Sequence, residues 1–114
     1  MTWTINFTPK IKRELRKLDK KDSLALLDYL ENEILPLEDP RTAAVQLKEN
    51  LKEYYKFRVG NFRIIANIQD TELIILVLRI ANRKDVYKKF KKPKKKPAKI
   101  LSFSDLKKKG PSGN

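Results

Sequence analysis

Three strand-like stretches joined by very short turns constrain this fold more than any other feature of the sequence. Glu53 to Val59 and Phe62 to Gln69 flank Gly60-Asn61, a dipeptide typical of a tight hairpin turn. Asp70-Thr71 connects the second stretch to a third, Glu72 to Ala81. Connections this short join antiparallel neighbours, because a parallel pair needs a crossover of a dozen or more residues. The segment therefore predicts an antiparallel meander of three strands.

The N-terminal part predicts one further strand and two helices. Trp3 to Phe7 alternates apolar and polar residues, as a half-buried strand does. Thr8-Pro9 is a typical helix start, and a second helix should begin near Asp22 and end before Pro36. A piece of helix or strand is expected near Val45-Gln46-Leu47. The helices carry apolar residues at helical spacing: Ile11, Leu15 and Leu18, then Leu24, Leu27, Leu30 and Ile34. The predicted fold is α+β, a small antiparallel β-sheet in the order βααβββ with a two-helix hairpin packed on one face.

The positive charge is concentrated at the C-terminal end. Residues 1–87 hold 16 Lys and Arg against 13 Asp and Glu, whereas residues 88–114 hold 11 Lys against one Asp. A length of 114 residues supports one domain. We predict a domain over residues 1–90 and a basic, flexible tail over residues 91–114, in which Ile100, Leu101, Phe103 and Leu106 could dock as a short helix. Charge in such a tail attracts phosphate regardless of sequence, so any specific chemistry should lie before it.

The composition excludes several kinds of chemistry. The chain has no cysteine and no histidine, which removes disulfides, thiolate nucleophiles and imidazole bases. No cluster of residues has metal-ligand spacing, so no metal and no cofactor is expected. No stretch is apolar enough for a membrane span, and the first residues do not resemble a signal peptide. The expected location is the cytoplasm.

Strand alternation sorts the charged side chains by face. It predicts that Ile74, Leu76, Leu78 and Ile80 face the helices, and that five cations converge on the opposite, open face: Lys56, Arg58, Arg63, Arg79 and Arg83. Such a face can simply be solvated. However, like charges side by side repel one another, and no carboxylate on the same strands balances them apart from Glu72. The excess of one sign favours a surface that binds a polyanion.

Two segments carry a family resemblance. Leu51 to Ala66 contains a tyrosine-rich strand with alternating basic residues, followed by Val59-Gly60-Asn61-Phe62-Arg63. Leu73 to Tyr87 contains a strand that ends in Ala-Asn-Arg, with Val-Tyr shortly after. Together they resemble the RelE branch of the RelE/ParE toxin superfamily over roughly residues 1–90. The resemblance implies a ribosome-dependent, metal-independent endoribonuclease that cuts messenger RNA in the ribosomal A site and is held by a RelB-like antitoxin in a hetero-oligomer.

The resemblance also implies roles for individual residues. Lys56 and Arg58 match the paired basic positions that hold or activate the 2′-hydroxyl and phosphate, and Arg63 matches the arginine that stabilises phosphate charge. Arg83 matches the arginine that assists the leaving group, and Tyr87 matches the proposed general base. Tyrosine has a reference pKa of about 10, which neighbouring cations lower. We expect RNA binding without a chemical role from the remaining cations of this region: Arg79, Lys84, Lys88 and Lys89.

The chain departs from the family pattern at two places. Ala81-Asn82 replaces the usual Gly-His or Gly-Lys, and Asn82 cannot titrate. Arg58 stands where some relatives have lysine, and arginine cannot act as a base although it grips phosphate with two donors. Three alternatives remain open at this point: a ParE-like inhibitor of DNA gyrase, a non-enzymatic basic RNA-binding protein, and a degenerate toxin that only binds an antitoxin.

Overall fold

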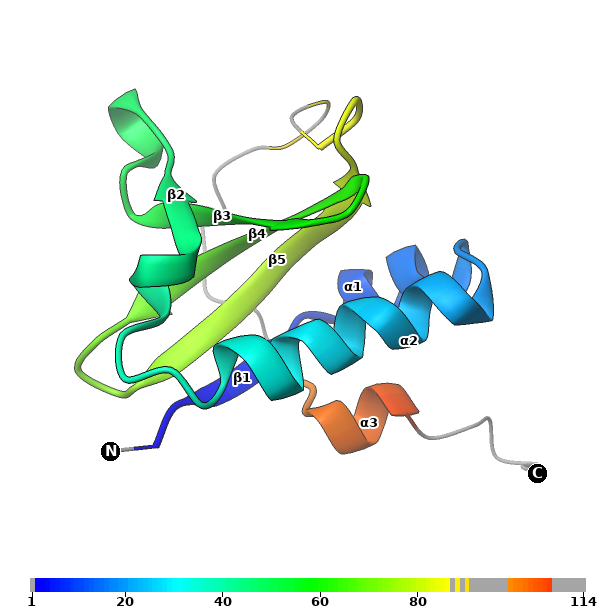
Figure 1. The fold of residues 1–114 in the computed structure, drawn as a ribbon, viewed down its shortest axis with the longest axis horizontal. Coiled ribbons are helices and arrows are strands. Elements are labelled where there is room, and N and C mark those ends of the chain that lie inside the picture. Colours follow the sequence, from blue (N-terminus) through cyan, green and yellow to red (C-terminus); the bar gives the residue numbers. More distant parts are fainter. Residues whose placement is uncertain (1, 87, 89, 91–98, 108–114) are drawn as a thin grey trace.

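A five-stranded sheet forms the centre of the protein, in the order β1-β5-β4-β3-β2. The computed structural model describes residues 2–86, 88, 90 and 99–107 (Figure 1). Strand β1 pairs in parallel with β5, and the other pairs are antiparallel. The α+β class and the meander are confirmed. The predicted N-terminal strand is present but pairs in parallel and not antiparallel, and β2 adds a fifth strand where a piece of helix or strand was expected. The strands are β1 (Thr4–Phe7), β2 (Ala44–Gln46), β3 (Tyr54–Val59), β4 (Phe62–Gln69) and β5 (Ile74–Asn82).

Two helices cover one face of the sheet, as predicted (Figure 1). Helix α1 (Pro9–Arg16) begins directly after Thr8, and helix α2 (Lys20–Tyr29) continues into a π-helical turn η1 (Leu30–Ile34). Short 3-10 turns, η2 (Pro40–Ala43) and η3 (Glu49–Leu51), flank β2. Leu24 is 45% exposed and so lies outside the predicted apolar stripe of this helix. Leu26, which was not predicted to belong to the stripe, is buried. Within the part of the chain that the structure describes, no helix is long and apolar enough to cross a bilayer.

The main core lies between the sheet and the two helices. Strands β3 and β4 supply it through alternate residues, Phe57, Ile64, Ala66 and Ile68, as predicted. The prediction for β5 is wrong over its first half, because Ile75 and Val77 face the helices and Leu76 and Leu78 face away. The physical reason is a register shift between Ile65 and Ala66. A bulge of this kind changes which side chains share a face, so only Ile80, beyond it, lies where alternation placed it.

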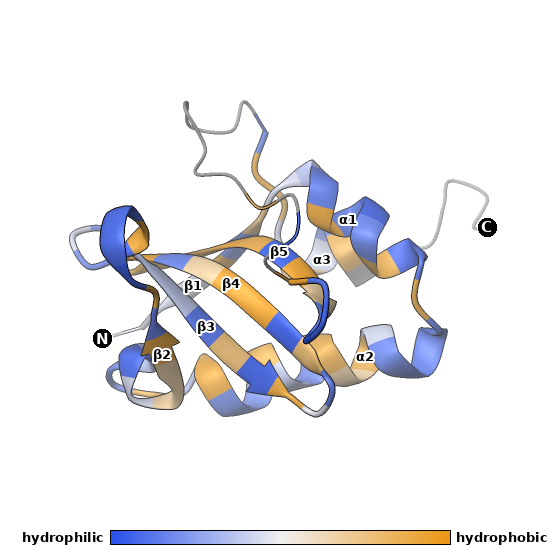
Figure 2. Ribbon diagram, turned by 90° about the horizontal axis from the view of Figure 1, so that it is seen from above, coloured by the Kyte–Doolittle hydropathy of each residue, from blue (hydrophilic) through white to orange (hydrophobic). Residues whose placement is uncertain are grey.

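A second, smaller apolar cluster covers part of the sheet face that was predicted to be open. Figure 2 shows hydrophilic and hydrophobic residues alternating along β3, so each face of the strand receives a different set. Phe90 packs edge-to-face on Tyr54 with ring centroids 5.8 Å apart. The chain that follows β5 therefore returns over this second face. The buried members of the cluster are Leu47, Tyr54, Ile65, Leu76, Leu78 and Val86.

The C-terminal segment docks on the edge of β1, as its apolar residues predicted. The backbone of Leu101 exchanges two hydrogen bonds with Phe7, at 2.7 and 2.8 Å, and Leu101 is 6% exposed. The short helix α3 (Phe103–Lys107) follows, and the ring of Phe103 stacks edge-to-face on Phe7 at 5.2 Å. Residues 99–107 thus pack on the domain, whereas residues 91–98 and 108–114 of the predicted tail lie outside the described residues.

Phe103→Ala should lower the free energy of unfolding by about 1–2 kcal/mol, because it removes an aromatic pair and a partly buried ring. The midpoint of urea unfolding measures this change. Ile100→Ala is the matched control, since Ile100 is 45% exposed on the same segment and its loss should cost less than about 0.5 kcal/mol. Equal midpoints for the Phe103 variant and the parent chain would show that the docked segment contributes nothing to stability.

Candidate active site

The β3–β4 hairpin brings three of the predicted site residues to one face of the sheet. Arg58 lies directly opposite Arg63 in the pairing register, and Lys56 lies opposite Ile65. Since directly paired residues share a face, the three cations lie on the same side as the buried Ile65, away from the helices. The turn that sets this register contains Gly60 at φ +57°, a left-handed conformation that favours glycine. We name these three cations, together with Arg83 in the turn after β5, the basic end of the sheet.

Arg63 is anchored to the hairpin turn by its own side chain. One of its guanidinium nitrogens, Nη1, donates hydrogen bonds to the backbone oxygens of Gly60 at 2.9 Å and Phe62 at 2.8 Å. A guanidinium held in this way keeps its remaining donors in a fixed direction. Arg58 across the strand pair is exposed. The two arginines therefore present one fixed and one exposed cation at the same end of the sheet.

Arg83 joins the basic end through the turn after β5. Its backbone N–H donates to the oxygen of Asn61 in the β3–β4 turn at 2.8 Å, and its side chain is exposed. Asn82 pairs with Phe62 at the last position of the β4–β5 register. The turn itself is closed by the backbone oxygen of Asn82, which accepts from Asp85 at 2.8 Å. Residues more than twenty positions apart in the sequence are thus assembled at one end of the sheet.

The remaining predicted residues differ in position. Tyr87 and Lys89 lie outside the described residues, although Val86 just before Tyr87 is 1% exposed. Lys84 is exposed, and only its backbone N–H takes part in the turn, donating to the side chain of Asn82 at 3.0 Å. Lys88 is exposed and pairs with Asp85 at 3.2 Å. A pair this exposed contributes little to stability, so the ammonium of Lys88 can exchange its partner for a phosphate.

Arg79 does not join the basic end. Its side chain is 11% exposed and forms an ion pair with Glu14 of α1, with Nη1 and Oε2 2.9 Å apart. Alternation placed Arg79 on the same face as Lys56, and the register agrees, since both residues pair with Ile65. The ion pair with Glu14 nevertheless holds the guanidinium of Arg79 toward α1. Sequence reasoning also missed Glu14. The available signal was a single carboxylate on the apolar side of a basic helix, between Ile11 and Leu18.

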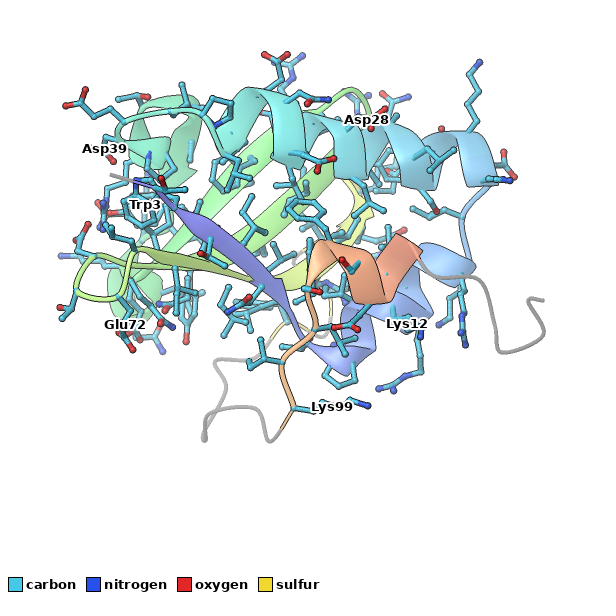
Figure 3. All side chains as sticks on the ribbon, turned by 90° about the horizontal axis from the view of Figure 1, so that it is seen from below. Trp3, Lys12, Asp28, Asp39, Glu72 and Lys99 are labelled. Carbon is cyan, nitrogen blue, oxygen red and sulfur yellow. The ribbon has the colours of Figure 1, made fainter. Side chains whose placement is uncertain are left out.

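A basic groove continues from the end of β5 along α1. It encloses about 540 Å³ and is open to solvent. Lys12 on the same helix extends outward (Figure 3). Residues of α1 and of the end of β5 line the groove, and one of them, Ala81, lies opposite Arg63 of the basic end. The charged side chains lining the groove are Lys10, Arg13, Glu14, Lys17, Arg79 and Asp85.

A separate ion network lies at the other end of β4. Arg41 donates two hydrogen bonds to the carboxylate of Asp70, at 2.7 and 2.8 Å, and a third to the hydroxyl of Tyr55 at 3.1 Å. The hydrogen bonds to Asp70 raise the pKa of Arg41 above its ordinary value. Trp3, close to Asp39 in Figure 3, donates its indole N–H to the backbone of Glu38 at 3.0 Å. This network holds the β4–β5 turn and takes no part in the basic end.

Within the described residues, no group of three or more carboxylates lies close enough to hold a metal ion. What the arrangement does supply is fixed positive charge. Two guanidinium groups and one ammonium lie on one sheet face, with Arg83 in the neighbouring turn, and such cations can bind a phosphodiester and stabilise additional negative charge on it.

The fold and this surface define a small α+β domain with a cationic sheet face, and comparison with known proteins places it in a family. Residues 5–87 match the family described as ParE toxin of type II toxin-antitoxin system, parDE. The chain therefore belongs to this family, within the RelE/ParE superfamily of type II toxins. Toxin RelG of Mycobacterium tuberculosis is 25% identical over 89 residues, which are 78% of this chain and 100% of that protein.

Solved structures show the same fold. The chain is similar to one chain of the RelBE2 toxin–antitoxin complex of Mycobacterium tuberculosis, with a TM-score of 0.66 and 23% identity over 73% of this chain and 100% of that one. It is also similar to a substituted RelE toxin of E. coli in complex with a peptide of the antitoxin RelBc, with a TM-score of 0.59 and 23% identity over 81% of this chain and 97% of that one. At this identity the likeness concerns the fold.

Proposed function

We propose that the chain is a ribosome-dependent endoribonuclease that cleaves messenger RNA in the ribosomal A site and so blocks translation. The observation that carries the proposal is the basic end. Lys56, Arg58 and Arg63 share one face through the hairpin register, and the backbone of Arg83 is bonded to the turn of that hairpin. These are four of the five residues to which the family resemblance assigns the reaction.

The proposed reaction is in-line attack of a 2′-hydroxyl on the neighbouring phosphorus. The hydroxyl loses its proton to a base as the new bond to phosphorus forms, and the bond to the 5′-oxygen breaks as that oxygen takes up a proton. Arg58 and Arg63 stabilise the negative charge on the pentacoordinate phosphorus, commonly the largest contribution to such catalysis. Arg83 assists the departing oxygen, Tyr87 is the proposed base, and Lys56 holds the attacking group.

Because the basic end is exposed, the ribosome is needed to orient the RNA for cleavage. Arg58 on the sheet face and Arg83 in the turn after β5 are both exposed, so neither residue by itself can select and orient a nucleotide. A strand held in the decoding site supplies that orientation, since fixing the reacting atoms accounts for much of the barrier in reactions of this kind. The groove along α1 gives the ribosome additional cations to contact, including Lys10, Arg13 and Lys17.

We further propose that an antitoxin neutralises this surface. A cationic face of this kind binds RNA non-specifically in a cell unless a partner covers it. The solved relatives with this fold include toxins in complex with antitoxins, which supports a partner of the same type here. The partner should carry acidic residues against the basic end and apolar residues against the sheet or the helices.

Expression of the chain alone should arrest bacterial growth and produce cuts in translated messages, and co-expression with its acidic partner should restore growth. Growth curves and mapping of message ends measure the two effects, and purified ribosomes programmed with a defined message provide the direct assay. Normal growth at a high level of folded chain, without cleavage on purified ribosomes, would contradict the nuclease assignment.

Inhibition of DNA gyrase is the second candidate, because the matched family is described by the parDE system. A supercoiling assay with purified gyrase distinguishes the two functions. The nuclease assignment expects normal supercoiling at concentrations of the chain that cleave message on the ribosome. The nuclease assignment also requires Lys56, Arg63 and Arg83 for phosphodiester chemistry. A gyrase inhibitor does not perform that chemistry and does not need these residues for it.

A further inference from the structure

A nearly buried ion pair joins α1 to the free part of the β5 edge. Strand β1 pairs with β5 only from Ile74 to Val77, so beyond that point the edge of β5 faces α1. One carboxylate oxygen of Glu14 accepts the backbone N–H of Ile80 at 2.9 Å, where a neighbouring strand would otherwise supply an acceptor. The other oxygen accepts from Arg79 at 2.9 Å, and the two side chains are 14% and 11% exposed. Glu14 thereby uses both of its oxygens to hold β5.

Arg79 uses its other donors on the turn that carries the proposed site. Its Nε donates to the backbone oxygen of Val86 at 2.8 Å, and its Nη2 donates to the backbone oxygen of Asp85 at 3.1 Å. These two carbonyl groups immediately precede residue 87 in the chain. The planar guanidinium makes all three connections at once, to α1 and to two successive peptide groups, which a lysine ammonium of similar length cannot reproduce.

We infer that Glu14 and Arg79 form a positioning clamp, which fixes the turn bearing Arg83 through the peptide carbonyl groups of Asp85 and Val86. The inference rests on the proposed function, because the clamp affects cleavage only if Arg83 and Tyr87 have the catalytic roles proposed above. Both side chains line the groove along α1, but they are nearly buried and bonded to protein groups, so the role inferred for them is positioning and not RNA contact. Displacement of a reacting group by about 1 Å can cost on the order of 10²-fold in rate, so a rigid turn matters for turnover more than for binding.

Arg79→Lys tests the clamp, because lysine keeps the charge opposite Glu14 but loses the fork of donors. We expect it to slow single-turnover cleavage of ribosome-bound message by on the order of 10- to 100-fold, while the affinity for the ribosome stays nearly unchanged. Amide hydrogen exchange at Arg83 and Asp85 should become faster, since their N–H groups close the turn.

Arg41→Lys is the matched control. Arg41 also spans a carboxylate and a third acceptor, Tyr55, but at the opposite end of β4. The Arg41→Lys variant should therefore leave the cleavage rate and the hydrogen exchange of the Arg83 amide at the parent values, even if the free energy of unfolding falls. If Arg79→Lys does not fold, Glu14→Gln is the alternative test. This variant keeps an oxygen for the N–H of Ile80 and removes the charge opposite Arg79. It should slow cleavage in the same way but to a smaller extent.

Three results would overturn the clamp. Equal cleavage rates for the Arg79 and Arg41 variants would show that any effect is general destabilisation. A loss of ribosome affinity larger than the loss of rate would make Arg79 an RNA contact. Unchanged amide exchange at Arg83 and Asp85 would show that the turn does not depend on Arg79. A parent chain that cleaves nothing on the ribosome would instead reject the proposed function, and the exchange measurement would then decide the structural part of the inference by itself.

Discussion

Tyr87→Phe should lower the rate of cleavage of ribosome-bound message by about 10²-fold or more, the usual contribution of a positioned general base. The substitution keeps the aromatic ring and removes only the ionisable oxygen, so affinity for the ribosome should stay nearly intact. The main chain enters residue 87 from Val86, which is 1% exposed and bonded to Arg79. The carbonyl group of Val86, directly before residue 87 in the chain, is therefore a fixed point of the fold. Single-turnover rates at saturating ribosome concentration measure the chemical step separately from binding.

Lys84→Ala is the control for this prediction. Lys84 lies in the same turn, its side chain is exposed, and its backbone alone bonds to Asn82. Its removal should leave turnover at the parent rate. If Tyr87→Phe also cleaves at the parent rate, the base is another group, and Lys56 becomes the next candidate. A gyrase inhibitor or a passive RNA-binding protein would show no difference between the two variants.

The hairpin that carries most of the basic end could be predicted from the sequence because its signals are local. Gly60-Asn61 defines the turn, and the turn defines the register. The register then places Lys56, Arg58 and Arg63 on one face, with Arg58 opposite Arg63. Each step uses neighbouring residues only, so the agreement between the predicted and observed faces of β3 and β4 follows from short-range geometry.

Strand β5 could not be predicted in the same way. Residues 73–78 are all apolar, so no polar residue marks which of them face the helices. The register shift between Ile65 and Ala66 arises in the pairing of two strands and has no local signature. The small cluster on the second face was missed for a related reason. It forms only when Val86 and Phe90 return over Tyr54, after the strands have ended.

The role of Arg79 shows a third limit. Arg79 and Glu14 are 65 residues apart, and nothing in either local pattern predicts that they meet. Arg79 therefore counted as one more cation on the sheet face. Glu14 nevertheless carried a weak signal, because a carboxylate on the core side of a helix otherwise rich in Lys and Arg needs a buried partner. An isolated charge that alternation or helical spacing directs inward indicates a long-range ion pair.

Arg58→Ala should lower cleavage by about 10²- to 10³-fold, the cost of losing one donor to the charged transition state. The same substitution should increase the stability of the free protein. Arg58 lies directly opposite Arg63 on the same face, and like charges at directly paired positions destabilise a sheet by roughly 0.2–1 kcal/mol. Bound phosphate removes this repulsion, so the pair is unfavourable only in the unbound chain. A rise in the midpoint of urea unfolding, together with a loss of activity, is the expected combination.

Lys21→Ala serves as the control for the Arg58 variant, because it removes one exposed positive charge on α2, which packs on the opposite side of the sheet. It should change neither the cleavage rate nor the stability appreciably. Arg58→Lys separates charge from geometry: it keeps the repulsion of Arg63 but offers a single ammonium in place of a planar fork, so activity should recover only in part. If Arg58→Ala lost stability and activity together, Arg58 would be a structural residue of the hairpin. Parent activity in Arg58→Ala would leave Arg63 and Arg83 as the groups that stabilise the phosphate.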